Sequence, residues 1–352
     1  MELPSSVKKG FSGAVGGTPL IRLETLSQIT GCNILGKADH LNPGAKYMIE
    51  SALAEGLLKP GGIIVEATAG NTGVGLVLAA NSLGFKCVFT CPEKVSKEKI
   101  DQLRNFGAEV IICPGSVPMS SPDHFITKAK IIAEERGGWN VQQFYNPNNW
   151  RSHYETSGPE IWRDTEGKID AFVAAAGTAG TIGGVSSYLK EKKEEVKIVL
   201  LDPYGSGVVY EKREGLIVSR MKTDDEKKKE KPSFVEGIGV SVDTFYGIRH
   251  AKLDATLRID DQITMEFVHY LLKHEGIFVG PSAAMNALVW VAHHLGPGHT
   301  VVTILCDSGN NYRSKIFNEE FQKEKGITVE RNDLKEFISA FDPLLFTNHW
   351  SQ

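Results

Sequence analysis

Short apolar segments that end in glycine-containing turns and lead into helical segments recur along this 352-residue chain. GGIIVEATAG (61–70) runs into NTGVGLVLAANSLG (71–84), and KIDAFVAAAG (168–177) runs into TAGTIGGVSSYLKEKKEE (178–195). Strands rich in Val and Ile that alternate with helices are typical of parallel sheets covered by helices on both faces. The sequence therefore predicts an α/β protein.

The strand–helix units fall into two clusters, at about residues 60–115 and 168–310, and a polar, aromatic stretch (139–158) lies between them. We expect two lobes, each a mostly parallel twisted sheet covered by helices, with a cofactor cleft between them. The predicted division is a large α/β domain from residues 1–40 and 148–330, a small α/β domain from 41–147, and a C-terminal tail from 331–352.

Composition excludes several classes of protein. A net charge of −4 gives no electrostatic reason to expect nucleic acid as a partner. No apolar run approaches about 18 residues, and the N-terminus has no apolar region typical of a signal peptide. The five scattered cysteines favour a reduced, cytoplasmic protein. We expect no metal site, because the adjacent His293 and His294 point to different helix faces and His299 follows a Gly-Pro-Gly turn.

Four glycine-rich loops carry the chemical information. Gly177–Thr181 (GTAGT) follows a strand and opens a helix, so its backbone amides and threonine hydroxyls suit a phosphate, although an ordinary tight turn would look the same. It matches neither the dinucleotide-binding pattern nor the P-loop. In the second loop, 68–73 (TAGNTG), the amides and the Thr72 hydroxyl suit a carboxylate, and Asn71 can donate to a ring oxygen. The other two loops are 280–284 (GPSAA) and 237–239 (GIG).

Together these loops and several flanking segments resemble the cysteine synthase branch of the fold type II pyridoxal-phosphate (PLP) enzymes. The resemblance runs from about residue 13 to 316 and rests on VGGTPLIRL, LNPG, EATAGNTGVGL, QFYNPNNWRSHYETSGPEIW, AAGTAGTIGG, VEGIG, EGIFVGPSAA and CDSGNNYRSK. It implies a PLP cofactor and, by analogy with family members, a homodimer.

The resemblance also implies a role for particular residues. The cofactor phosphate would be held by Gly177, Thr178, Ala179, Gly180 and Thr181; Asn71 would bind the ring hydroxyl, and Ser282 would face the pyridine nitrogen. The substrate would be held by Thr68, Ala69, Thr72, Gln143 and Gly237. Ala69 stands where the family usually has serine, and Ala284 replaces a usual glycine.

A serine at the pyridine nitrogen has a chemical consequence. The neutral hydroxyl of Ser282 does not force that nitrogen to stay protonated, as a carboxylate would. The cofactor would then be a moderate electron sink, which favours loss of the α-proton and a β leaving group over transamination. We therefore expect β-replacement: an O-activated serine such as O-acetylserine reacts with sulfide or a thiol.

One departure from the family concerns the lysine that this chemistry requires. The family pattern after the Asn-Pro turn is Gly-Gly-Ser-Val/Ile-Lys-Asp-Arg, whereas here Gly44 is followed directly by Ala45 and Lys46. The resemblance therefore implies that about seven residues, including the family's Schiff-base lysine, are deleted. Because seven residues are close to two helical turns, the helix would keep its buried face, predicted as Met48, Ala52, Leu53 and Leu57.

Three interpretations of this departure stay open. Lys46 replaces the missing lysine as the catalytic residue; or the chain is an impaired variant of an active enzyme; or it is a non-catalytic protein that binds PLP or a partner. We expect cysteine synthase-like activity by family, with a small-molecule amino acid and sulfide as partners and no membrane span. Cystathionine β-synthase-like activity is the alternative.

Overall fold

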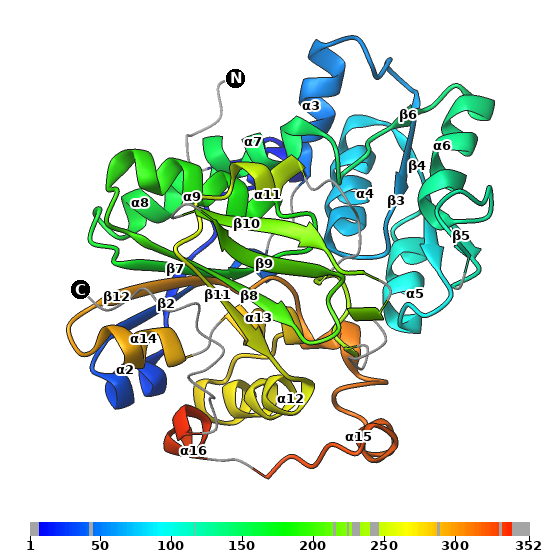
Figure 1. Cartoon of the computed structure of the whole chain (residues 1–352). Helices are drawn as coiled ribbons and strands as arrows, with labels where there is room; N and C mark the ends of the chain where they lie inside the picture. The colour runs from blue at the N-terminus through cyan, green and yellow to red at the C-terminus, as the bar shows by residue number, and fades with distance from the viewer. Residues whose placement is uncertain are drawn as a thin grey trace. The chain divides into compact units, whose positions relative to one another are not determined.

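The computed structural model describes residues 7–41, 45–115, 117–213, 216–223, 225–226, 233–239, 246–286, 289–330 and 333–339. The chain divides into two compact units: unit 1 comprises residues 1–17 and 41–149, and unit 2 comprises residues 18–40 and 150–352. Figure 1 shows the helices and strands of both units. The large and small domains outlined from the sequence stay a prediction.

Unit 1 contains a four-stranded parallel sheet with the strand order β5-β4-β3-β6. Its strands are β3 (Ile63–Ala67), β4 (Lys86–Pro92), β5 (Glu109–Cys113) and β6 (Trp139–Asn140). Its helices are α1 (Gly10–Ala14), α3 (Lys46–Ala54), α4 (Asn71–Leu83), α5 (Lys97–Asn105) and α6 (Phe125–Arg136). The helix α7 (Pro147–Glu155) begins at its end.

The central strand β3 sends alternate side chains to two cores. Ile64 packs in the core that α3 and α4 cover, together with Met48, Ile49 and Leu76. Val65 packs in the other core, which is lined by Ala129 and further residues of α6. This period of two is the expected behaviour of a strand covered on both faces, and the predicted α/β class is confirmed.

The helix α3 follows the position of the predicted deletion and is nine residues long. Met48 and Ala52 are buried and Leu53 is partly buried, as expected, but Leu57 is 59% exposed. The prediction for Leu57 was wrong because the helix ends at Ala54 and the chain then turns through Gly56 at φ 72°. Leu58, 3% exposed, enters the core instead.

Two adjacent leucines therefore give a matched test of this turn. We expect Leu58→Ala to lower the free energy of unfolding by about 2–5 kcal/mol, because it leaves a cavity in a packed core. Leu57→Ala should change it by no more than about 0.5 kcal/mol, since its side chain contacts mostly solvent. Urea unfolding of both variants checks this, and equal effects would contradict the described end of α3.

Unit 2 contains a six-stranded sheet with the strand order β1-β2-β12-β7-β8-β11, in which only the β1–β2 pair is antiparallel. The strands are β1 (Leu20–Arg22), β2 (Asn33–Lys37), β7 (Ala171–Ala175), β8 (Lys197–Pro203), β11 (Ala255–Ile259) and β12 (Thr300–Ile304). A separate antiparallel hairpin pairs β9 (Val208–Arg213) with β10 (Leu216–Met221).

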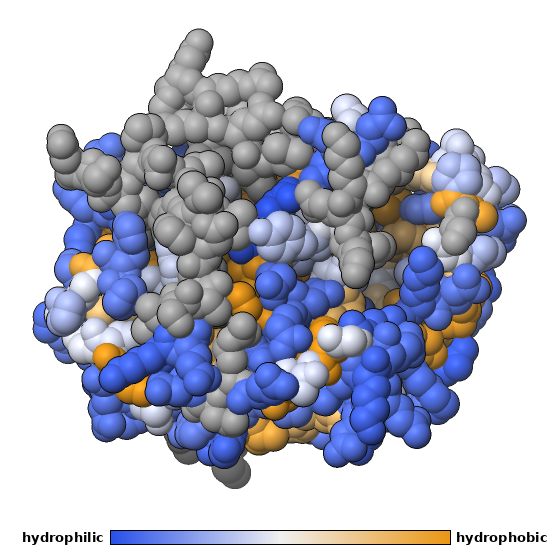
Figure 2. Space-filling view, turned by 60° about the horizontal axis from the view of Figure 1, so that its bottom comes forward, coloured by the Kyte–Doolittle hydropathy of each residue, from blue (hydrophilic) through white to orange (hydrophobic). Residues whose placement is uncertain are grey.

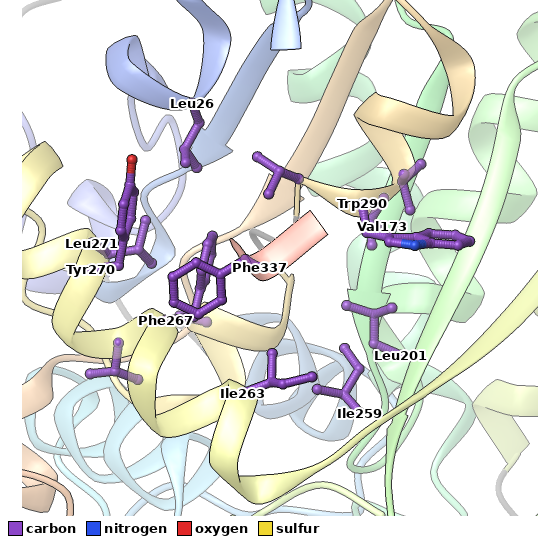
Figure 3. Close-up of a cluster of buried hydrophobic side chains, with 14 of the residues drawn as sticks. Leu26, Val173, Leu201, Ile259, Ile263, Phe267, Tyr270, Leu271, Trp290 and Phe337 are labelled. Carbon is purple, nitrogen blue, oxygen red and sulfur yellow. The ribbon is translucent and has the colours of Figure 1, made fainter. Parts of the chain in front are cut away.

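The helices of unit 2 follow its strands in the alternation predicted from the sequence. They are α2 (Glu24–Thr30), α8 (Ser157–Asp164), α9 (Gly180–Lys192), α11 (Tyr246–His250), α12 (Asp261–Tyr270), α13 (Pro281–Asn286), α14 (Trp290–Leu295), α15 (Glu319–Lys325) and α16 (Leu334–Ser339). Between sheet and helices, the strand residues Val173 and Leu201 belong to one buried cluster with Ile263 and Phe267 of α12, and Figure 3 shows part of this cluster. Phe337 of α16 packs edge-on against Phe267.

Several predicted features lie wholly or partly outside the described residues. These are the Asn42-Pro43-Gly44 turn, most of the charged run 222–231, and the tail beyond residue 339. On the face in Figure 2, hydrophilic residues are interspersed with smaller apolar areas over the described surface. Among the described helices, none is long and apolar enough to cross a membrane.

Candidate functional site

Two of the predicted loops occupy equivalent places in the two units. Thr68–Gly70 joins β3 to α4 in unit 1, and Ala176–Ala179 joins β7 to α9 in unit 2. Each loop follows the carboxyl end of a parallel strand and leads into a 13-residue helix. This is where α/β proteins bind anionic ligands, because unsatisfied N–H groups and the helix dipole favour negative charge there.

The backbone of the 177–181 loop has the conformation of an anion site. Ala179, the residue before α9, is left-handed at φ 61° and ψ 11°. A left-handed residue next to helical residues turns successive N–H groups toward one point, which forms a concave anion-binding nest. Left-handed alanine is unfavourable by itself, and such conformations concentrate at ligand sites. The Gly180 N–H also lies 3.4 Å from the Thr178 hydroxyl oxygen.

The 237–239 loop packs directly against this nest. A Cβ at Gly177 would lie 2.2 Å from the Gly237 carbonyl oxygen, so only glycine fits there. The Gly239 N–H donates to the Ala176 carbonyl at 3.1 Å. The structure therefore brings together two of the four loops singled out in the sequence, through backbone contacts that leave no room for side chains.

Behind the nest lies a histidine that the sequence analysis did not single out. His153 of α7 has its Nε2 3.3 Å from the Thr181 hydroxyl and its Nδ1 2.9 Å from the Ser157 hydroxyl. Burial lowers the pKa of His153 to about 4, so the imidazole is neutral at pH 7. A neutral ring that donates from Nε2 would leave the Thr181 proton free for a ligand. Only the position of His153 within a matched segment pointed to it.

The 280–284 loop is anchored to another matched segment of unit 2. The Gly280 N–H donates to the Asp307 carbonyl at 3.0 Å, and a Cβ at Gly280 would lie 2.3 Å from Asp307 Oδ1. Tyr312 donates to Asp307 Oδ2 at 2.7 Å, and burial raises the Tyr312 pKa well above its usual value. Ser282, 6% exposed, follows this anchor in α13. The side chain of Ala284 lies outside the described residues.

In unit 1, the loop after β3 is shaped by close packing. The Thr68 hydroxyl accepts a hydrogen bond from the Gly70 N–H at 3.3 Å. The Thr68 methyl packs on Gly73, because a Cβ added to Gly73 would lie only 2.9 Å from that methyl carbon. Ala69 packs on the core that α4 covers. Asn71 is exposed at the first turn of α4 and Thr72 is partly exposed, so both side chains can reach a ligand.

Gln143 reaches the same loop from a distant part of the chain. Its Nε2 donates to the Ala67 carbonyl at 2.8 Å, next to Thr68. The side chain is buried, and its backbone carbonyl accepts from Asn149 Nδ2 at 2.8 Å. The structure thus gathers the predicted substrate residues of unit 1 at the carboxyl end of β3.

Lys46 is the first residue of α3, and its side chain is 30% exposed. Its Nζ lies 3.3 Å from Glu50 Oε1, one helical turn along. Partly exposed pairs of this kind contribute little to stability. The turn that precedes Lys46 lies outside the described residues.

Comparison with known proteins gives a consistent result. A family model described as pyridoxal-phosphate dependent enzyme matches residues 11–307. Cysteine synthase 2 of Schizosaccharomyces pombe is 37% identical, over 96% of this chain and 91% of its own length. Cysteine synthase of Dictyostelium discoideum is 40% identical, over 92% of this chain and 88% of its own length.

Solved structures resemble the chain as well. An O-acetylserine dependent cystathionine β-synthase from Helicobacter pylori aligns with a TM-score of 0.74 and 30% identity, covering 88% of this chain and 98% of that one. A lysine-to-alanine variant of O-ureido-L-serine synthase with O-ureido-L-serine bound aligns with a TM-score of 0.75 and 26% identity. The alignment covers 94% of this chain and 98% of that one.

Proposed function

Because the chain belongs to the family of pyridoxal-phosphate-dependent enzymes, we propose that it has the cofactor and substrate sites of a cysteine synthase. The substrate would be O-acetylserine or another O-activated serine. Sulfide would replace the acetate at Cβ, while the α-proton is removed and then returned. Turnover of this chain would be impaired, because the segment carrying the family's cofactor-bearing lysine is missing after Gly44.

The observation that carries this proposal is the similarity to cysteine synthases over more than nine-tenths of the chain. One solved relative is an O-acetylserine dependent cystathionine β-synthase, which supports the same activated serine with a larger thiol as the second candidate.

The residues of unit 2 fit a PLP phosphate. The left-handed Ala179, the start of α9 at Gly180 and the contact of Gly177 with Gly237 form a backbone cradle closed to side chains. Thr178 and Thr181 add hydroxyls, and the neutral His153 would orient the Thr181 hydroxyl toward the phosphate. A dianionic phosphate is well matched to such a site.

The residues of unit 1 fit an amino-acid carboxylate. We assign it to the loop Thr68–Thr72 and to Gln143, and we assign the ring hydroxyl of the cofactor to Asn71. The usual serine is Ala69 here, so one donor is missing from this loop. In unit 2, we assign a substrate-binding role to Gly237.

PLP, when bound, supplies the electron sink that eases loss of the α-proton and of the β leaving group. Ser282 would face its pyridine nitrogen with an uncharged hydroxyl. An uncharged partner at this nitrogen makes the cofactor a weaker electron sink and disfavours transamination.

Among the described residues, we identify no positioned general base for the α-proton. Lys46 begins a shortened helix and pairs with Glu50, so we do not assign it the role of the missing lysine. A protein of this fold with one lysine changed to alanine has been solved with O-ureido-L-serine bound. That structure supports the idea that such a site binds an O-substituted serine without one of its lysines. A homodimer in the cytoplasm, inferred from the resemblance and composition, stays a further proposal.

Loading with PLP tests the proposal. We expect the purified chain to bind one PLP per protomer reversibly, so that dialysis removes it and borohydride leaves no single labelled peptide. O-Acetylserine should change the spectrum of the bound cofactor. A stoichiometric borohydride adduct on the peptide containing Lys46 would overturn the assignment of an absent lysine, and failure to bind PLP at all would overturn the proposed cofactor site.

A further inference from the structure

We propose that Glu66 is a positioning residue of the substrate site, which fixes the turn at Gln142–Gln143 and so holds the Gln143 side chain against the end of β3. The inference rests on the proposed function, because it deepens the role of Gln143 there. The family resemblance assigned no role to Glu66.

Glu66 occupies an unusual place for a carboxyl group. It lies in β3 between β4 and β6, and by the period of two it faces the same side as Ile64, which packs in the core under α3 and α4. Its side chain is 1% exposed. A buried carboxyl costs several kcal/mol of stability unless hydrogen bonds compensate for the lost water, so its partners are informative.

Those partners all belong to the two segments that meet here. The Gln143 N–H donates to Glu66 Oε2 at 3.2 Å. Burial raises the Glu66 pKa to about 7, while hydrogen bonds from the Gln143, Ala67 and Gln142 backbones and from the Gln143 side chain lower it. Hydrogen bonds that lower the pKa are those that stabilise the ionised carboxylate, so these amides are arranged around this group.

The turn that Glu66 holds is strained by itself. Gln142 is left-handed at φ 55°, a conformation that costs a residue with a side chain about 1–3 kcal/mol and persists only where the surroundings impose it. The preceding residue, Val141, still pairs with β3 through its N–H and the Val65 carbonyl at 3.0 Å. Directly after this left-handed residue, the Gln143 N–H comes within hydrogen-bond distance of Glu66.

Gln143 is consequently fixed at three points. Its N–H donates to Glu66, its carbonyl accepts from Asn149, and its side-chain amide donates to the Ala67 carbonyl, next to Thr68. Without an acceptor at position 66, the buried Gln143 N–H would lose its partner. The turn would then relax, and the Gln143 amide would leave the Thr68 loop.

Variants at position 66 test this in the PLP-loaded protein, with the dissociation constants of O-acetylserine and PLP as the two readouts. Glu66→Leu removes the acceptor and should raise the dissociation constant of O-acetylserine at least tenfold, while the dissociation constant of PLP stays unchanged. Glu66→Gln keeps an acceptor oxygen and should stay within about threefold of the parent chain. Glu266→Leu is the matched control, since Glu266 is 2% exposed in α12 and should leave both constants unchanged.

A double-mutant cycle separates positioning from general support. If Glu66 acts through Gln143, adding Glu66→Leu to Gln143→Ala should not weaken the binding of O-acetylserine any further. Additive losses, an unchanged O-acetylserine constant in Glu66→Leu, or equal losses for O-acetylserine and PLP would each overturn the inference. Should Glu66→Leu fail to fold, Glu66→Met replaces it, because its flexible side chain adapts to the same space.

Amide hydrogen exchange keeps the inference independent of the proposed function. If the parent chain binds no O-acetylserine, the proposed substrate is wrong, but amide exchange in residues 141–146 still tests whether Glu66 holds this turn. Glu66→Leu should accelerate exchange there while Glu66→Gln and Glu266→Leu do not. Equal exchange in all four proteins would overturn the role of Glu66.

Discussion

Insertion of Gly-Ser-Val-Lys-Asp-Arg-Ala after Gly44 is expected to raise cysteine formation from O-acetylserine and sulfide by about 100-fold or more. The reason is that a positioned general base contributes about 10²–10⁴ to the rate of a proton transfer. Under the proposed deletion, the parent chain would lack this base, and Lys46 pairs with Glu50 on a nine-residue helix. The rate of cysteine formation in PLP-loaded protein measures the effect.

The insertion is also expected to be compatible with the fold. Seven residues add nearly two turns, about 10 Å of helix, with a phase error of only about 20°. The buried residues Met48, Ile49 and Ala52 would therefore keep their contacts with the core of unit 1.

The matched control is the same insertion with alanine in place of its lysine. It restores helix length without the amine, so it should fold like the full insertion and remain as slow as the parent chain. Equal gains in both insertions would show that helix length, not the lysine, limits turnover. No gain in either would contradict the interpretation of the chain as an impaired cysteine synthase.

Much of the fold was predictable because its signals are local. Val- and Ile-rich strands and glycine turns are patterns of consecutive residues, so the α/β class and the strand–loop–helix positions at Thr68 and Gly177 follow from the sequence. The end of α3 was not predictable from periodicity, because the chain turns at the left-handed Gly56. After this turn Leu58, and not Leu57, is buried in the core.

The contacts that support the candidate site were harder to predict. His153 meets Thr181 although 28 residues separate them, and Glu66 meets Gln143 across 77 residues. Neither partner belongs to the same loop as the residue it supports. Side chains that act through tertiary contacts leave no spacing rule in the sequence, so only the structure identifies them.

The second large effect concerns the cradle at Gly177. We expect Gly177→Ala to weaken PLP binding about ten- to a hundredfold, which corresponds to the roughly 1–3 kcal/mol that overpacking costs. The added Cβ would lie 2.2 Å from the Gly237 carbonyl oxygen, a backbone atom that no rotamer change can move away. The two loops would have to separate, and the amides around Ala179 would lose their common direction.

Gly13→Ala in α1 is the control, since its Cβ would meet no atom closer than 3.7 Å. It should leave the PLP dissociation constant unchanged, as fluorescence titration would measure. If Gly177→Ala does not fold, Thr181→Val replaces it as the test. This substitution keeps the side-chain volume but removes the hydroxyl beside His153, so it should still weaken PLP binding. Unchanged PLP affinity in a folded Gly177→Ala protein would mean that the phosphate binds elsewhere, because a cradle built from backbone amides depends on its spacing. Unchanged PLP affinity in Thr181→Val would contradict the role assigned to its hydroxyl.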